Sequence, residues 1–359
     1  MGDLSPDSPV RAFLGYMGKT AKGGEVNSSS GRRQSDGDRR CLASRYDFGR
    51  RLLRWFDRNQ RDLPWRRDRD AYHVWLSEIM LQQTRVGAVV EHYHRFLERF
   101  PTLEVLAAAP LSSVLAAWSG LGYYRRAHRL HAAAREVDHR CQGRFPSTRA
   151  ELEALPGIGR YSSAAIASIA FGEPVAAVDG NVERVLQRVL GRSMSGKPLW
   201  QAAAELLSPR RPGDFNQAMM ELGATLCLPR EPRCRLCPVH GMCRTQGELE
   251  PLLPARRRAK QAVEYALDSR RDLVFLVRRS RQTTLMPGMW ELPELPTNQA
   301  ATGPCLTLRH SITSTDYRVR VAWVRLPPKA KGCWFKTSRV EQLPLTGLAR
   351  KILRQAKLI

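Results

Sequence analysis

The sequence predicts a two-domain protein in which an all-α domain precedes a smaller α+β domain, and three observations predict this class. Apolar residues recur at three- and four-residue steps from Tyr46 to about Gln246. The Pro- and Arg-rich residues 251–262 then end this pattern, and the segments after them alternate apolar and polar residues with a period of two. The 359 residues are enough for about two domains.

The first 44 residues are rich in Gly, Ser, Asp and Arg and show neither helical nor strand periodicity. We therefore expect a disordered leader over residues 1–44. The N-terminus lacks the apolar stretch and cleavage site of a secretory signal, and no run of 18 apolar residues occurs. Since the cysteines outside residues 227–243 are scattered, we expect a reducing compartment. The location that we expect is the cytoplasm of a bacterium, in association with the nucleoid.

Residues 45–250 form the predicted helical domain. Helical periodicity runs through residues 48–59, 74–100, 111–137 and 160–171. Proline and glycine separate these stretches, so we expect several helices joined by short turns.

Residues 263–359, which follow the linker 251–262, form the predicted second domain. The stretches "DLVFLVRR" (272–279) and "YRVRVAWVRL" (317–326) have the composition and alternation of strands, and "LTGLARKILRQAKLI" (345–359) has a helical pattern. These segments predict a mixed α+β fold.

The chain carries a formal net charge of +24 and has a pI of about 10.5. A polyanion is the simplest partner for such a charge, and nucleic acid is the leading candidate. The alternative is a general enrichment in arginine, as in a GC-rich coding sequence.

Four of the eight cysteines lie close together, with gaps of six, two and five residues: Cys227, Cys234, Cys237 and Cys243. Four thiolates suit either a tetrahedral zinc ion or an iron-sulfur cluster. Zinc ribbons use two CxxC pairs, whereas this loop has one, so the spacing favours the cluster. A disulfide is the least expected alternative. Arginines of the same loop could contact backbone phosphate: Arg230, Arg233 and Arg235.

The stretch "LEALPGIGRYSSAAI" (152–166) predicts a helix, a tight turn and a second helix. Gly157 and Gly159 would expose backbone N–H groups where the second helix begins, and such groups can bind a phosphate. An ordinary connection between two helices is the alternative.

Two carboxylates are candidates for chemistry. Glu78 lies among apolar residues in "YHVWLSEIMLQQTRV", and such surroundings raise the pKa of an acid toward the range useful for proton donation. It could instead be a solvated residue on a polar helix face. Asp179 precedes Gly180 and Asn181, a pattern that taken alone predicts a helix N-cap.

Several motifs together resemble the MutY branch of the endonuclease III superfamily of DNA glycosylases. They are the four-cysteine loop, the LPGIG turn, the Glu78 segment with "LPWR" before it, "WSGLGYYRRAHRLHAAA" and "FNQAMMELGATLC". The resemblance covers residues 46–246 strongly and 251–359 weakly. It implies a two-lobed helix-hairpin-helix glycosylase with a [4Fe-4S] cluster on the four cysteines, followed by a MutT-like (Nudix-like) domain.

The resemblance also implies a set of catalytic roles. Glu78 would protonate the departing adenine, and Asp179 would stabilise the sugar cation. Tyr161 and Asn181 would support the intermediate. Position 161 is a lysine in the bifunctional glycosylase-lyases, where it forms a Schiff base. The phenol of Tyr161 cannot form one, so the sequence predicts a monofunctional hydrolase.

Further residues would contact the DNA if the resemblance holds. Gln83 and Tyr123 would wedge into the base stack, and Arg66 and Gln217 would line the adenine pocket. From composition alone, such buried amides and aromatic residues are more often core or capping residues.

The second domain would read the opposite base. "TTLMPGMWELPEL" (283–295) resembles the first strand and loop of the MutT-like domain, and no Nudix hydrolase signature is present, so we expect a binding fold. The register places Ile312, Thr313 and Ser314 where many MutY proteins have Phe-Ser-His. Thr313 would supply a hydroxyl to 8-oxoguanine. The expected partner is double-stranded DNA with an A:8-oxoguanine or A:G mispair, bound by a monomer away from any membrane.

Two other functions stay open at this point. One is an endonuclease III-like glycosylase-lyase that acts on oxidised pyrimidines, and Tyr161 argues against it. The other is a DNA-binding iron-sulfur protein without catalysis, in which Glu78 and Asp179 would have no chemical role.

Overall fold

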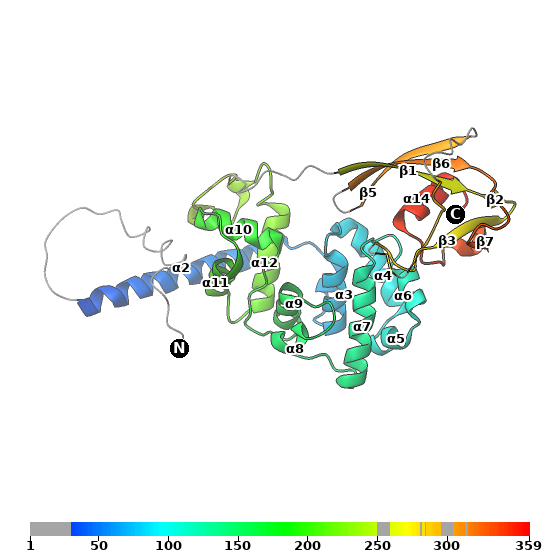
Figure 1. Ribbon diagram of the computed structural model, residues 1–359. Coiled ribbons are helices and arrows are strands. Elements are labelled where there is room, and N and C mark those ends of the chain that lie inside the picture. Colours follow the sequence, from blue (N-terminus) through cyan, green and yellow to red (C-terminus); the bar gives the residue numbers. More distant parts are fainter. Residues whose placement is uncertain (1–29, 250–258, 281, 284, 296–303, 313–314) are drawn as a thin grey trace. The chain divides into compact units, whose positions relative to one another are not determined.

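The computed structural model describes residues 30–249, 259–280, 282–283, 285–295, 304–312 and 315–359 (Figure 1). The chain divides into two compact units, one formed by residues 1–78 and 145–253 and the other by residues 79–144 and 254–359. Most of the predicted linker lies outside the described residues. No helix in the described part is long and apolar enough to cross a membrane.

Helices make up the first unit. The elements are α2 (Ser30–Asn59), η1 (Pro64–Arg66), most of α3 (Ala71–Leu81), α8 (Arg149–Glu153), α9 (Arg160–Ala170), α10 (Gly180–Leu190), α11 (Gly196–Leu206), α12 (Pro212–Thr225), η2 (Cys234–Leu236) and η3 (His240–Met242). One hydrophobic core joins α2, α10, α11 and α12, and three of the four clustered cysteines pack against it. The core thereby holds the cysteine loop next to α10.

Helix α2 begins inside the predicted leader. It starts at Ser30, whereas the sequence predicts disorder through residue 44. The apolar residues Phe48, Leu52 and Phe56 anchor its C-terminal half in the core. Once a helix is nucleated, each further residue adds one hydrogen bond. The half of α2 that is packed in the core therefore explains why the helix extends toward Ser30, although the sequence there has no helical periodicity. Residues 1–29 lie outside the described residues.

The second unit contains a helical part with α4 (Val86–Arg99), α5 (Leu103–Ala108), α6 (Leu111–Ala117) and α7 (Arg125–Arg140). Two stretches that read as continuous helices are in fact broken. Residues 74–100 divide between α3 and α4, and residues 111–137 divide between α6 and α7. The second break contains Gly120 and Gly122 with positive φ angles, which end a right-handed helix.

The second unit also contains the strands. They are β1 (Ala259–Leu267), β2 (Ser269–Arg270), β3 (Leu273–Arg278), β4 (Trp290–Glu291), β5 (Cys305–Ile312), β6 (Thr315–Trp323) and β7 (Cys333–Lys336). Strand β6 lies between β1, which is parallel to it, and β5, which is antiparallel (Figure 1). Strand β3 pairs antiparallel with β2, β4 and β7.

Two helices follow the strands, α13 (Thr337–Val340) and α14 (Gly347–Gln355). The core of this part joins strand residues such as Val274 and Val319 to Ile352 and Leu353 of α14. The structure confirms the predicted strands at 272–279 and 317–326, the C-terminal helix and the α+β class.

Candidate active site

Glu78 lies near the C-terminal end of α3 and is only 7% exposed. Its helix neighbours Val74, Trp75 and Ile79 are buried apolar residues, which explains why the acid is enclosed. Burial raises the pKa of Glu78 from 4.5 to about 7. The predicted shift of this pKa is therefore confirmed, and Glu78 can hold a proton near neutral pH.

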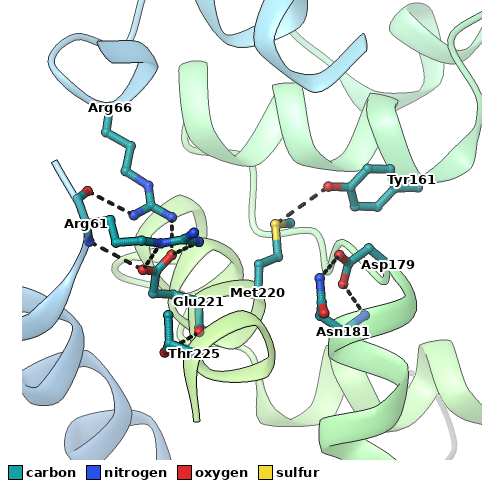
Figure 2. A network of polar contacts seen from close by, with 8 residues as sticks. All are labelled: Arg61, Arg66, Tyr161, Asp179, Asn181, Met220, Glu221 and Thr225. Atoms are coloured by element: carbon teal, nitrogen blue, oxygen red, sulfur yellow. Dashed lines mark hydrogen bonds and ion pairs between the residues drawn. The ribbon is translucent and has the colours of Figure 1, made fainter. Parts of the chain in front are cut away.

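Tyr161 is in the first turn of α9 and faces Glu78. Its polar hydroxyl lowers the pKa of Glu78 and partly opposes the effect of burial. The same hydroxyl lies 3.6 Å from Met220 Sδ of α12 (Figure 2). Burial and the two nearby carboxylates, Glu78 and Asp179, raise the pKa of Tyr161 well above 10, so the phenol stays neutral.

Asp179 caps the N-terminus of α10, as its flanking sequence predicts. Its Oδ1 accepts hydrogen bonds from the backbone N–H groups of Asn181, at 2.9 Å, and Val182, at 2.8 Å. Its Oδ2 accepts a third from Asn181 Nδ2 at 2.8 Å (Figure 2). Three donors therefore fix the carboxylate in one orientation. The capping role does not exclude chemistry, because the negative charge of Asp179 also acts on Glu78 and raises its pKa.

The two acids thus have different environments within one unit. Glu78 is buried and gains a pKa suited to a proton donor, whereas Asp179 is half-buried and receives three N–H donors. Two carboxyl groups whose environments differ in this way divide acid and charge-stabilising roles between them.

Arg66 lies beside this pair and is held by a carboxylate that the sequence analysis missed. Glu221 of α12 has a fully buried side chain that bonds Arg66 at 2.8 Å and Arg61 at 2.6 Å (Figure 2). Burial alone would raise the pKa of Glu221, but the two arginines lower it below its usual value. Gln217, the other residue predicted to line the adenine pocket, is half-buried one helical turn before Glu221.

A close contact between helices explains the position of Asn181. A Cβ atom at Gly223 of α12 would lie 2.6 Å from Asn181 Cβ, so α10 and α12 approach closely only because residue 223 is glycine. Arg184 then bonds Asn181 Oδ1 at 2.9 Å and the carbonyl oxygen of Gly223 at 2.7 Å. The two contacts with Gly223 join residues about 40 positions apart, and no local pattern indicates them.

The four clustered cysteines line a single cavity next to α10. All four are free thiols, so the structure contains no disulfide among them. Arg188 of α10 holds the loop, since its guanidinium lies 3.3 Å from Cys227 Sγ and donates to two loop carbonyl groups, those of Leu228 and Pro229, at 2.6 and 2.9 Å. Within the described ranges, no group of three or more His, Cys, Asp or Glu side chains is arranged to hold one metal ion.

Four cysteine thiols around one cavity form a donor set that fits an iron-sulfur cluster. A zinc ion with Zn–S bonds of about 2.3 Å requires four sulfur atoms drawn closely together. A four-iron cluster is wider, so its cysteines surround a cavity. The loop arginines, Arg230, Arg233 and Arg235, are exposed.

The predicted hairpin is present between α8 and α9. Gly157 has a φ of +80°, a conformation that glycine adopts most readily. Gly159 is the N-cap of α9 and provides no side-chain cap, and a Cβ atom there would meet no atom within 4 Å. The turn therefore presents open backbone at the start of an 11-residue helix, as a phosphate contact requires.

Gln83 and Tyr123 are exposed residues of the second unit with unusual backbones. Their φ angles are +58° and +48°, which is rare for residues other than glycine and is most frequent at functional sites. Both line a cavity of about 720 Å³. Several cations and no acid line the same cavity: Arg125, Arg126, Arg350, Lys351 and Arg354. Thr313 lies outside the described residues.

Comparisons with known proteins agree with this geometry. Residues 76–209 match the family described as HhH-GPD superfamily base excision DNA repair protein. A solved structure of a thermostable thymine-DNA glycosylase is 32% identical, with a TM-score of 0.54, over 57% of this chain and 97% of that one. The chain therefore has the helix-hairpin-helix fold of DNA glycosylases.

Curated relatives identify the branch. The adenine DNA glycosylase of Rattus norvegicus is 49% identical over 57% of this chain and 44% of its own length. That of Schizosaccharomyces pombe is 32% identical over 70% of each chain. The chain belongs to the adenine DNA glycosylase family. It spans less than half the length of the first mammalian and plant relatives that it matches.

Proposed function

We propose that this protein is a monofunctional DNA glycosylase that removes adenine mispaired with 8-oxoguanine or guanine in double-stranded DNA. The observation that carries the proposal is the enclosed Glu78 carboxyl, whose pKa is about 7, beside Tyr161 and the charge of Asp179. Membership of the adenine DNA glycosylase family supports adenine as the base.

The chemistry follows from the two acids. Glu78 donates its proton to a ring nitrogen of adenine, which leaves with the electron pair of the glycosidic bond. The sugar becomes an oxocarbenium-like cation, and the Asp179 carboxylate stabilises it by electrostatics or transient covalent capture. Water adds to the anomeric carbon and loses a proton to a carboxylate, which restores the enzyme. Asn181 keeps Asp179 oriented through the bond from its Nδ2.

Tyr161 supports hydrolysis over strand cleavage. A lyase of this superfamily would use an amine at this position to form a Schiff base, and a neutral phenol cannot do so. The product would therefore be an abasic site in an intact strand, and the strand would break only after alkali.

The four cysteines, Cys227, Cys234, Cys237 and Cys243, would hold a [4Fe-4S] cluster as thiolates. When bound, the cluster would tie residues 227–243 into one rigid loop and present the loop arginines to the DNA backbone. Arg188 would position Cys227 for this ligation.

DNA recognition would involve both units. The backbone of the turn at Gly157 and Gly159 would bind a phosphate. Gln83 and Tyr123 would wedge into the stack, and filling that gap offsets part of the few kcal/mol that base extrusion costs. Arg66 and Gln217 would contact the extruded adenine.

The strand-containing part of the second unit would act as a MutT-like module that reads the base opposite adenine. Its basic cavity, which Gln83 and Tyr123 also line, supports an anionic partner. Thr313 would supply a hydroxyl for this recognition. We expect the protein to act as a monomer in the bacterial cytoplasm.

A cleavage assay tests the proposal. Duplexes carry A:8-oxoguanine, A:G, T:G or thymine glycol, and each reaction is divided between samples with and without alkali. The T:G duplex is included because a thymine-DNA glycosylase is 32% identical. We expect free adenine from the first two duplexes and strand breaks only after alkali. Cleavage of thymine glycol without alkali, or a borohydride-trapped adduct, would instead support a lyase.

A further inference from the structure

Arg126 of α7 is buried, yet none of its hydrogen-bond partners is a carboxylate. Its two terminal nitrogens carry four hydrogens and lie within hydrogen-bond distance of six acceptors, five carbonyl oxygens and one hydroxyl, so some hydrogens are shared between two acceptors. Removing a charged group from water is costly unless polar partners replace the water. So many bonds from one side chain to backbone indicate that Arg126 has a specific structural task.

The acceptors belong to two separate breaks between helices. NH1 donates to the carbonyl oxygens of Ile79, Met80 and Gln82 at 2.9, 2.8 and 2.5 Å. NH2 donates to Thr84 Oγ1 at 3.0 Å, and also to the carbonyl oxygens of Leu121 and Gly122 at 3.2 and 3.3 Å. Ile79, Met80, Gln82 and Thr84 lie at or just after the end of α3, whereas Leu121 and Gly122 precede α7.

Each break contains one residue other than glycine with a positive φ angle, Gln83 in the first and Tyr123 in the second. Such a backbone costs of order 1–3 kcal/mol and persists only where its surroundings enforce it. Arg126 bonds the residues on both sides of Gln83, namely Gln82 and Thr84, and both residues before Tyr123. Its Cζ also lies 5.4 Å from the centre of the Tyr123 ring, and its backbone N–H bonds the Tyr123 carbonyl oxygen at 2.8 Å.

We propose that Arg126 is a positioning residue that holds Gln83 and Tyr123 in one fixed arrangement for insertion into the DNA base stack. The inference rests on the proposed function, because the wedging role of these two residues belongs to it. Arg126 itself need not touch the DNA. It acts by joining the end of α3 to the start of α7.

Only arginine can make this set of contacts. Burial lowers the pKa of Arg126 to about 10, so the side chain keeps its charge at neutral pH. The last carbonyl groups of α3 stabilise this positive charge, because the C-terminal end of a helix carries a partial negative charge. Lysine would keep the charge, but its single ammonium group has three donors and cannot reach both breaks at once.

The first test measures hydrogen exchange in the free protein, so it does not depend on activity. We expect Arg126→Lys to speed exchange at the amides of Thr84 and Leu121, which bond the carbonyl oxygens of Leu81 and Trp118. Arg129→Lys is the matched control, since Arg129 is an exposed residue of the same helix. Unchanged exchange at both amides in Arg126→Lys would overturn the proposal.

The second test measures base extrusion. The Glu78→Gln background blocks adenine release, and a 2-aminopurine beside the target adenine reports the loss of stacking. Adding Arg126→Lys to this background should reduce the fluorescence increase at saturating protein by about half or more. The faster amide exchange described above would identify the structural cause.

The adenine release rate of the single Arg126→Lys variant should fall about 10- to 100-fold, as for a misplaced positioning group. If wild type releases no adenine, the proposed function fails, while the exchange measurement still decides whether Arg126 holds the two breaks. If wild type is active and Arg126→Lys matches it in base extrusion and in rate, the inference about Arg126 fails while the proposed function stands.

Discussion

The Tyr161 hydroxyl of α9 lowers the pKa of the Glu78 carboxyl of α3, although the two residues lie 83 positions apart in the sequence. Burial acts in the opposite direction and raises the pKa of Glu78. The balance leaves that pKa at about 7, where the acid can still donate a proton under physiological conditions. In the proposed mechanism, position 161 thus tunes the proton donor, and the same position excludes Schiff-base chemistry.

Tyr161→Phe should move the pH dependence of adenine release. Loss of the hydroxyl should raise the pKa of Glu78, so the rate should begin to fall at a higher pH than in wild type. Single-turnover rates from pH 5 to 9 measure the shift. Tyr46→Phe is the control, because Tyr46 is 71% exposed. A fall in rate at the same pH as wild type would show that Tyr161 does not tune Glu78.

Asp179→Asn separates helix capping from catalysis. Asparagine caps a helix about as well as aspartate, so the melting temperature should stay close to that of wild type. The rate of adenine release should nevertheless fall by about 10²- to 10³-fold, since the stabilising charge is lost. Asp179→Ala, by comparison, should also cost about 1 kcal/mol of stability through the lost cap. A fully active Asp179→Asn variant would restrict this residue to capping.

Glu78→Gln should change the dependence of stability on pH. The folded-state pKa of about 7 lies above the ordinary value of 4.5, so the native protein keeps a proton that the unfolded chain releases. Wild-type stability should therefore fall as pH rises from 4.5 to 7, by at most about 3 kcal/mol, and stay level above that window. Urea unfolding at pH 5 and pH 8 should show a smaller loss for Glu78→Gln. Equal losses in both proteins would contradict a protonated Glu78.

Cys237→Ser should reduce the iron and acid-labile sulfide that purify with the protein, because it removes one of the four proposed cluster ligands, which line one cavity. Cys141→Ser is the matched control, since Cys141 is a free cysteine outside the loop. Elemental analysis of both variants and wild type measures the effect. Wild type that binds one zinc ion and no iron would contradict the cluster.

The pattern of neighbouring residues in the sequence predicts some features of the site but not others. The apolar neighbours of Glu78 indicate a buried acid, and the residues after Asp179 indicate a cap, because both signals lie within one or two turns of helix. Glu221 is different, since its importance comes from Arg61 and Arg66, 160 and 155 positions away. The three- and four-residue spacing of apolar residues also does not show where a helix is interrupted. The breaks at Gln83 and Tyr123 depend on contacts from Arg126 that only the folded chain creates.

The role of Glu78 as proton donor is tested most directly by the rate of adenine release from an A:8-oxoguanine duplex. The rate is measured from pH 5 to 9 under single-turnover conditions, for wild type and for Glu78→Gln. We expect a wild-type rate that falls above about pH 7, as Glu78 loses its proton. The variant should be slower by about 10²- to 10⁴-fold and should lack this fall. A Glu78→Gln variant with the wild-type rate and pH profile would contradict the role of Glu78 as the proton donor.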